Sequence, residues 1–373
     1  MLKVRTWSKK NKIVGKPPLG CQLCALGSKL VIFITGKCPF NCYYCPVSTQ
    51  RKADVIFANE QKIDAVEEAI DEAKQINALG ASITGGEPTL KIERTLNYIQ
   101  RLKEEFGKEF HIHLYTARAI PNEELEMLYS VGLDEIRFHF PQLKKSEEIE
   151  KSIKEAAKHN WKVGIEIPAI PGKKLEIEHI VEFAIKNKLD FVNLNEFEFA
   201  ETNFKNLRKK DFRPVSNTQS AVKGSKELAL KILKKFRKSN ITLHFCSSVY
   251  KDRIQLRNRF IRRAKNYAKK HDWITKEGLI VRGRIIVDKK EDIKDILEYM
   301  KNELYVSEDM LSAEIEKKAI YTSSLIIKET AEILKNKFED KISQIAIIEQ
   351  YPMENGFITY LDPLFEKSHI STE

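Results

Sequence analysis

Short apolar runs alternate with amphipathic stretches from about residue 29 to residue 246, and this alternation limits the folds open to the chain. The first run, residues 29–35 (KLVIFIT), is rich in β-branched and aromatic residues, which favours a buried strand. Residues 64–79 follow with apolar side chains at helical spacing and end at Gly80, a common helix stop. Six such strand–helix units, with no sign of two halves, predict a parallel sheet curved into a partial (β/α)6 barrel. The remaining strands are expected at residues 81–84, 110–116, 135–140, 163–167 and 191–195, with a last candidate at 241–245.

The chain divides into four predicted segments. Residues 1–28 form an N-terminal extension, residues 29–249 the partial barrel, residues 250–272 a basic helical connector, and residues 273–373 a smaller α+β domain. The fold class is therefore α/β, with a separate C-terminal α+β domain. In that domain, the apolar patterns predict strands at 278–287, 345–349 and 357–361, helices at 293–304 and 324–338, and a hairpin turn at Asn355-Gly356.

The net charge of the chain, +11, would attract nucleic acid or anionic substrates. A lysine- and glutamate-rich solvated surface, as in heat-adapted proteins, explains the charge equally well. No apolar run approaches the roughly 20 residues that a membrane helix needs, and the N-terminus lacks the apolar core of a signal peptide. We therefore expect a soluble cytoplasmic protein without a membrane partner.

Cys38, Cys42 and Cys45 directly follow the first predicted strand. Clustered cysteines in a large intracellular chain indicate metal binding rather than disulfides. Three thiolates this close can hold three corners of a cubane iron–sulfur cluster and leave the fourth iron open to a small molecule. A GGEP segment at residues 85–88 directly follows the second strand. Because barrel active sites lie at the C-terminal ends of the strands, both motifs are expected at the same end of the barrel.

A strand, a CxxxCxxC motif with Tyr44 before its last cysteine, a second strand and a GGEP segment together resemble the radical S-adenosylmethionine (radical SAM) superfamily. The resemblance covers roughly residues 29–246. It implies that Cys38, Cys42 and Cys45 hold a [4Fe–4S] cluster whose fourth iron is chelated by the amino and carboxylate groups of SAM. An electron from the cluster would then break a sulfur–carbon bond of SAM, and the resulting 5′-deoxyadenosyl radical would abstract hydrogen from a substrate. An electron donor such as a ferredoxin or flavodoxin would reduce the cluster.

The resemblance also assigns the GGEP segment to SAM. Gly85 and Gly86 would line the amino group, since glycines let the backbone approach a ligand closely. The carboxylate of Glu87 would suit the ammonium charge. Tyr44 would lie near the adenine. Read alone, the same segment is an ordinary turn.

Further SAM or substrate contacts are expected at the ends of later strands. Glu166 lies in the fifth strand, where the superfamily has adenine contacts, although the match of the surrounding residues is loose. Asn195 ends the sixth strand and could hold the ribose or the substrate, as could His139 at the end of the fourth. Polar rim residues with satisfied hydrogen bonds are the alternative. The sequence assigns no catalytic residue.

Three further cysteines lie outside the motif. Cys21 and Cys24 form a CxxC just before the barrel, and Cys246 ends the last candidate strand. Together they could hold a second iron–sulfur cluster, for which a fourth ligand is missing; the substrate, His244 or a carboxylate could fill that place. A redox CxxC, a zinc site shared with the later cysteines, and a buried inert thiol at Cys246 are the alternatives.

The segment 250–270 is strongly basic, and Arg259, Arg262 and Arg263 could share one helical face. Such density could track the phosphates of an RNA. A solvated helix, or one paired with the acidic C-terminal helices, is the alternative. Three substrate classes therefore compete: an RNA, a protein such as a glycyl-radical partner, and a small metabolite. The extra domain favours a macromolecule. A non-catalytic zinc- and RNA-binding module is the contrasting hypothesis.

Overall fold

The computed structural model describes residues 3–8, 11–353 and 356–367. The chain forms two compact units, Met1–Leu256 and Arg257–Glu373, each with a hydrophobic core of its own. None of the helices in the described ranges combines the length and the apolar character that crossing a bilayer requires.

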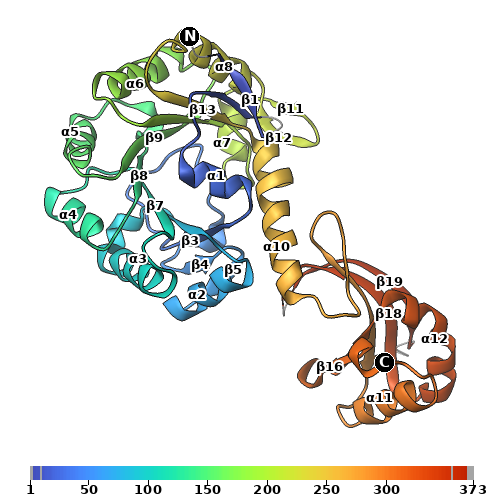
Figure 1. Ribbon diagram of the computed structural model, residues 1–373. Helices are drawn as coiled ribbons and strands as arrows, with labels where there is room; N and C mark the ends of the chain where they lie inside the picture. The colour runs from blue at the N-terminus through green and yellow to red at the C-terminus, as the bar shows by residue number, and fades with distance from the viewer. Residues whose placement is uncertain (1–2, 9–10, 354–355, 368–373) are drawn as a thin grey trace. The chain divides into compact units, whose positions relative to one another are not determined.

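The first unit is a curved sheet of parallel strands with helices around its outside (Figure 1). Neighbouring parallel strands follow one another in the chain, and β13 pairs in parallel with β10. The predicted α/β fold with a partial barrel is confirmed, and the candidate strand at 241–245 is present. Within the described residues, the parallel strands are β3 (Lys29–Phe33), β6 (Gly80–Thr84), β7 (His111–Thr116), β8 (Glu135–Phe138), β9 (Lys162–Ala169), β10 (Phe191–Glu196) and β13 (Thr242–Cys246). The helices that connect them are α2 (Val66–Gln75), α3 (Ile92–Phe106), α4 (Asn122–Ser130), α5 (Glu147–Ala156), α6 (Lys174–Lys186), α7 (Phe204–Lys209) and α8 (Ser225–Lys235), and a hairpin of β11 (Pro214–Ser216) and β12 (Gln219–Val222) lies between α7 and α8.

Short antiparallel strands flank the parallel ones on both sides. β4 (Ile56–Ala58) and β5 (Gln61–Ile63) lie beyond β3, while β1 (Arg5–Trp7) and β2 (Asn11–Val14) lie beyond β13. β2 is hydrogen-bonded to β13, with Ile13 opposite His244. The N-terminal extension therefore belongs to the barrel sheet. β2 could not be predicted from the sequence, because it has only four residues and two of them, Asn11 and Lys12, are polar or charged.

The interior of the barrel is polar, because side chains alternate across each strand. One set, including Leu114, Ile136 and Leu194, is fully buried among the apolar residues of the core. The alternate positions carry hydrogen-bonding or charged groups and line cavities inside the barrel. They include Ser82, Tyr115, Arg137, Glu166, Asn193, Asn195 and His244.

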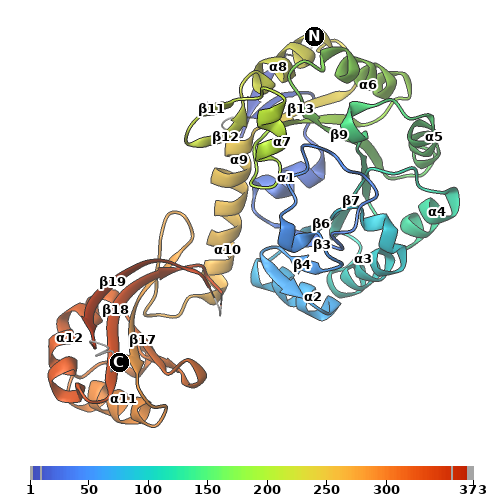
Figure 2. The same ribbon diagram turned by 180° about the vertical axis from the view of Figure 1, so that it is seen from behind.

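Helix α1 (Leu19–Ala25) lies within the ring of strands in both views (Figures 1 and 2). Gly20 makes this position accessible, since a Cβ atom there would lie 2.5 Å from His113 Nδ1 and 2.7 Å from Arg137 Nη2. Only a residue without a side chain fits so close to the imidazole of His113 and the guanidinium of Arg137. The helix therefore brings Cys21 and Cys24 close to the polar side chains that point into the barrel.

The second unit is a small α+β domain, as predicted. Its sheet has the order β16-β17-β15-β18-β19, with β14 paired to β15, and helices α11 and α12 pack on one face around Ile285 and Ile345. Asn355 of the predicted hairpin turn lies outside the described residues. The described elements are α10 (Arg257–Tyr267), β14 (Trp273–Ile274), β15 (Ile280–Val287), α11 (Asp292–Asn302), β16 (Ser312–Glu314), β17 (Ala319–Thr322), α12 (Ser324–Phe338), β18 (Ile342–Gln350) and β19 (Ile358–Glu366).

The predicted continuous basic helix is broken. A turn at α9 (Ser248–Tyr250) is followed by π-helical residues Lys251–Leu256 and then by α10. Arg263 is only 6% exposed, and its Nε donates to the carbonyl of Pro352 at 2.7 Å. The expectation that Arg263 shares an exposed phosphate-binding face is therefore wrong, because its guanidinium is used inside the second unit.

Candidate active site

The three motif cysteines lie in the loop that follows β3. Cys38 is exposed, while Cys42 and Cys45 are partly buried, and a turn closes where Cys45 N donates to Cys42 O at 3.0 Å. All three line one cavity of about 370 Å³, here called the mouth cavity. The GGEP segment lines the same cavity, so the structure brings together the two motifs that the sequence placed at one end of the barrel.

The GGEP segment is tied to the cysteine loop by its backbone. Gly86 N donates to the Thr35 carbonyl at 2.7 Å, and Glu87 N donates to the Lys37 carbonyl at 2.8 Å. A Cβ atom on Gly85 would lie 2.5 Å from the Thr35 oxygen, and one on Gly86 would lie 2.5 Å from that of Lys37. The glycine pair is therefore required for the two loops to meet.

Glu87 is fully buried, and its carboxylate links the loop after β6 to the end of β7. Its Oε1 accepts hydrogen bonds from Thr89 N, from Thr89 Oγ1 and, at 3.0 Å, from Thr116 Oγ1. Its Oε2 accepts from Ala117 N at 2.6 Å, the only bond to that oxygen among the described residues. The carboxylate therefore fixes the GGEP segment to the end of β7.

Tyr44 is held by a chain of hydrogen bonds that reaches β8 and β9. His139 Nδ1 lies 3.0 Å from the Glu166 carbonyl, which can only accept, so Nδ1 carries the proton. His139 Nε2 then accepts from the Tyr44 hydroxyl at 3.0 Å, and that hydroxyl accepts from Gln142 N at 2.8 Å. Burial lowers the pKa of His139, which keeps the imidazole neutral as this chain requires.

Two residues that the sequence analysis did not identify hold the cysteine loop from the other side. The buried Asn203 donates through Nδ2 to the Tyr44 carbonyl at 3.0 Å, and Thr202 Oγ1 donates to the Cys45 carbonyl at 3.3 Å. Both lie in the insertion between β10 and α8. Isolated polar residues in a loop give no sequence signal, because their partners are more than 150 residues away along the chain.

Glu166 and Asn195 line two cavities at once, the mouth cavity and a deeper one of about 340 Å³, here called the inner chamber. Glu166 Oε2 accepts from Arg137 Nη1 at 2.8 Å and Asn193 Nδ2 at 2.9 Å, while Oε1 accepts from Asn195 Nδ2 at 2.9 Å. Burial opposes the charge on Glu166, but Arg137 and the amide donors outweigh it and hold the pKa below its usual range.

The three non-motif cysteines meet in the inner chamber. Cys21 and Cys24 come from α1, and Cys246 comes from the end of β13. Cys21 Sγ accepts from Arg137 Nη2 at 3.6 Å and from Asn193 Nδ2 at 3.5 Å. All six cysteines are free thiols. In the part of the chain that the structure describes, no three His, Cys, Asp or Glu side chains, the motif cysteines included, are already grouped as ligands of a metal ion.

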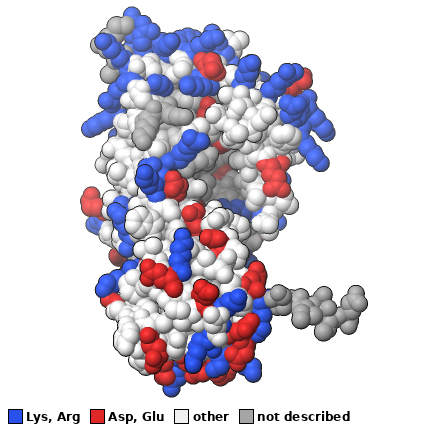
Figure 3. Space-filling model, turned by 90° about the vertical axis from the view of Figure 1, so that its right-hand side faces the viewer, with Lys and Arg blue, Asp and Glu red and all other residues white. Residues whose placement is uncertain are grey.

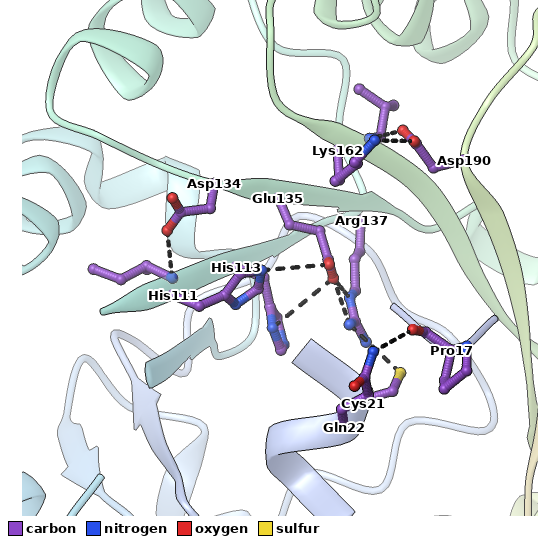
Figure 4. Close-up of polar contacts among 12 residues, drawn as sticks. Pro17, Cys21, Gln22, His111, His113, Asp134, Glu135, Arg137, Lys162 and Asp190 are labelled. Atoms are coloured by element: carbon purple, nitrogen blue, oxygen red, sulfur yellow. Dashed lines mark hydrogen bonds and ion pairs between the residues drawn. The ribbon is translucent and has the colours of Figure 1, made fainter. Parts of the chain in front are cut away.

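A buried charge network lies between strands β7 and β8 and helix α1 (Figure 4). Glu135 forms an ion pair with Arg137, and its Oε2 lies 3.6 Å from His111 Nε2. Lys29 Nζ lies 2.8 Å from His111 Nδ1 and donates to the His111 carbonyl at 3.0 Å. Burial lowers the pKa of Lys29 to about 7. Burial opposes ionisation of Glu135, but Arg137 and His111 lower its pKa to about 2.

Two family models match the chain. The radical SAM superfamily matches residues 32–184, and a domain of unknown function, DUF8061, matches residues 278–364. A curated protein of Methanocaldococcus jannaschii, "Putative glycyl-radical enzyme activating enzyme MJ0021", is 42% identical over 361 residues, which is 94% of each chain.

Solved structures align with parts of this chain at low identity. SuiB of Streptococcus suis bound to S-adenosylmethionine aligns with 18% identity and a TM-score of 0.42, over 59% of this chain and 50% of that one. Methylornithine synthase (PylB) aligns with 16% identity and a TM-score of 0.40, over 60% of this chain and 72% of that one. The match thus spans about half the length of SuiB. The barrel's family match, together with a relative 42% identical over nearly the whole chain, shows that this chain belongs to the radical SAM superfamily.

Proposed function

We propose that this radical SAM enzyme cleaves SAM reductively in the mouth cavity and uses the 5′-deoxyadenosyl radical to abstract hydrogen from a protein substrate. The superfamily implies a [4Fe–4S] cluster and SAM, and the residues present fit both. Cys38, Cys42 and Cys45 share one cavity with the glycine pair, whose missing side chains leave the backbone accessible. This convergence of two motifs in one cavity is the observation that carries the proposal.

The residues of the chain would position the reactants. When bound, the cluster supplies the electron that breaks a sulfur–carbon bond of SAM. Glu87 is buried and bonded to Thr116 and Ala117, so it would hold the GGEP backbone in place beside the amino group of SAM, and Tyr44, fixed by His139, forms a wall of the cavity. The burial of Glu87 and Tyr44 strengthens these contacts, because little water competes for them.

A protein is the substrate class that we favour. The relative from M. jannaschii carries a name that refers to activation of a glycyl-radical enzyme, and it matches both units of this chain. RNA has weaker support, since Arg263 is buried and its guanidinium is used inside the second unit, although lysines and arginines predominate over the upper part of the face in Figure 3. A ferredoxin or flavodoxin would supply the electron.

We also propose that the inner chamber holds a second iron–sulfur cluster. Three thiols from α1 and β13, which are far apart in sequence, line this one cavity. Arg137 and Asn193 already donate hydrogen bonds to Cys21 Sγ, as donors around a cluster thiolate do. The zinc alternative would replace iron at the same residues, and metal analysis of anaerobically purified protein separates the two.

SAM cleavage is tested with anaerobically reconstituted protein, dithionite and SAM. The wild type should form 5′-deoxyadenosine, and Cys42→Ala should lose it. Lys52→Ala, an exposed change near the same loop, is the matched control and should keep the activity. Product formation by Cys42→Ala at the wild-type rate would refute the assignment.

The substrate class is tested with macromolecules from a fully deuterated cell extract, dialysed free of small molecules. Hydrogen abstraction transfers deuterium to 5′-deoxyadenosine, which mass spectrometry detects. A protein substrate predicts that the deuterium signal survives ribonuclease treatment and disappears after proteinase treatment. The reverse result would establish RNA, and a signal found only in the dialysate would establish a small metabolite; either would refute the proposal.

A further inference from the structure

His244 lies in the wall of the inner chamber with an unused ring nitrogen. It sits in β13, opposite Asn193 of β10, and is 1% exposed. The ring of Trp7 meets it edge-on, with 5.2 Å between ring centroids, and so restricts the orientation of the imidazole. Among the described residues, Nε2 has no hydrogen-bond partner.

The neighbouring hydrogen bonds determine which ring nitrogen carries the proton. Asn193 Nδ2 donates to the Glu166 carboxylate at 2.9 Å, and because a carboxylate can only accept, this bond fixes the orientation of the amide. Asn193 Oδ1 therefore faces His244 Nδ1, at 3.3 Å. An amide oxygen can only accept, so Nδ1 carries the hydrogen. In the neutral ring, Nε2 then presents a lone pair to the chamber.

A buried lone pair without a partner destabilises the fold unless a donor or a metal meets it. Nitrogen ligands of metals show the pattern found here, in which the other ring nitrogen donates to an oxygen that fixes the ring. The chamber that Nε2 lines also contains Cys21, Cys24 and Cys246. These thiols are three of the four ligands that a fully protein-bound cubane needs.

We propose that His244 Nε2 is the fourth protein ligand of an iron–sulfur cluster held by Cys21, Cys24 and Cys246. This inference rests on the proposed second cluster. Such a cluster has every iron bound by protein, which suits it to electron transfer rather than to binding SAM. A cluster also places each ligand on a separate iron, so the ligands stand farther apart than around one ion. Histidine ligation raises cluster potentials in Rieske centres, and we expect the same direction here.

The test uses the triple variant Cys38→Ala/Cys42→Ala/Cys45→Ala, which removes the motif ligands and leaves the inner chamber intact. Protein labelled with ¹⁵N-histidine is reconstituted anaerobically, analysed for iron, sulfide and zinc, and reduced for pulsed EPR. We expect about four irons per chain and a nitrogen coupling that changes with the isotope. His244→Cys in this background should keep the iron, lose the coupling and lower the reduction potential.

Controls make each outcome decisive. His179→Gln, at an exposed position, should leave the coupling unchanged, and circular dichroism establishes that His244→Cys folds. Iron without a nitrogen coupling, or a coupling that persists in His244→Cys, overturns the histidine ligand and leaves the second cluster standing. A triple variant that binds zinc or no iron overturns both. Formation of 5′-deoxyadenosine by the wild type is measured separately, so failure of the proposed function is recognised independently.

Discussion

The Tyr44 hydroxyl lies 3.0 Å from His139 Nε2, and this pair joins the cysteine loop to the end of β8. The tyrosine stands between Cys42 and Cys45 in the chain, so its anchoring limits where both thiols can lie. Tyr44 therefore has a structural role that does not depend on a bound cofactor. The resemblance implies an adenine contact in addition.

Tyr44→Phe should destabilise the first unit. The change removes the donor to His139 Nε2 and leaves Gln142 N without its acceptor, and each buried group left unpaired costs about 1–3 kcal/mol. Urea unfolding of the apoprotein measures the loss. Tyr129→Phe, a half-exposed tyrosine of α4, is the control and should change the free energy of unfolding by less than about 0.5 kcal/mol. Equal stability of wild type and Tyr44→Phe would contradict the anchoring role.

Asn203→Ala should weaken the hold on the cysteine loop. The amide donates to the carbonyls of Tyr44 and Glu198, and its loss leaves both without this donor. We expect slower cluster reconstitution and iron that is chelated faster by EDTA under anaerobic conditions. Asn217→Ala, an exposed asparagine of the same insertion, should behave as the wild type does. Identical iron-release rates in all three proteins would exclude a positioning role for Asn203.

Gly86→Ala should abolish 5′-deoxyadenosine formation. The added methyl would lie 2.5 Å from the Lys37 oxygen, so the GGEP segment and the cysteine loop must separate. Gly107→Ala provides the contrast, because nothing lies within 4 Å of a Cβ there and the cost is that of a positive φ with an extended ψ, about 1–3 kcal/mol. Assays of SAM cleavage distinguish the two, and an active Gly86→Ala protein would show that the loops need not meet.

Lys29 should make the stability of the barrel depend on pH. Its pKa falls to about 7 in the folded state from about 10.5, so between these values the unfolded chain binds the extra proton. The contribution of Lys29 to stability therefore rises as pH rises from 7 towards 10. Lys29→Met should flatten this slope in urea unfolding followed at several pH values, whereas parallel curves for the two proteins would refute the lowered pKa.

Arg263→Leu should act on the second unit rather than on RNA binding. The guanidinium donates to the Pro352 carbonyl, and its removal leaves that oxygen unpaired, at about 1–3 kcal/mol. Thermal unfolding should show the loss, while tRNA affinity measured at low salt should be unchanged relative to Lys276→Leu, an exposed control. A selective loss of tRNA affinity in a stably folded Arg263→Leu protein would restore the RNA hypothesis.

The barrel and its two loops could be predicted because their signals are local. Residues 29–35 and 110–116 read as strands from their own composition, and the cysteine spacing is contained in eight residues. The convergence at the mouth cavity then followed from parallel topology alone. The burial of Arg263 in the basic segment could not be predicted, because its partner is a backbone carbonyl 89 residues away.

The polar interior could not be predicted for a related reason. Alternating polar residues such as His111, His113, Glu135 and Arg137 usually indicate a strand face in water. Here α1 covers them, and the sequence of α1 shows only a short CxxC segment with a glycine. The pairing of Asn193 with His244 depends on the register of two strands about fifty residues apart, which no local pattern specifies.

The pairing of β2 with β13 has a consequence for how the protein is made. Residues 12–14 leave the ribosome about 230 residues ahead of their partners at 243–245. β2 can therefore pair with β13 only after the other parallel strands of the first unit have been made, so this edge of the barrel sheet closes late in synthesis.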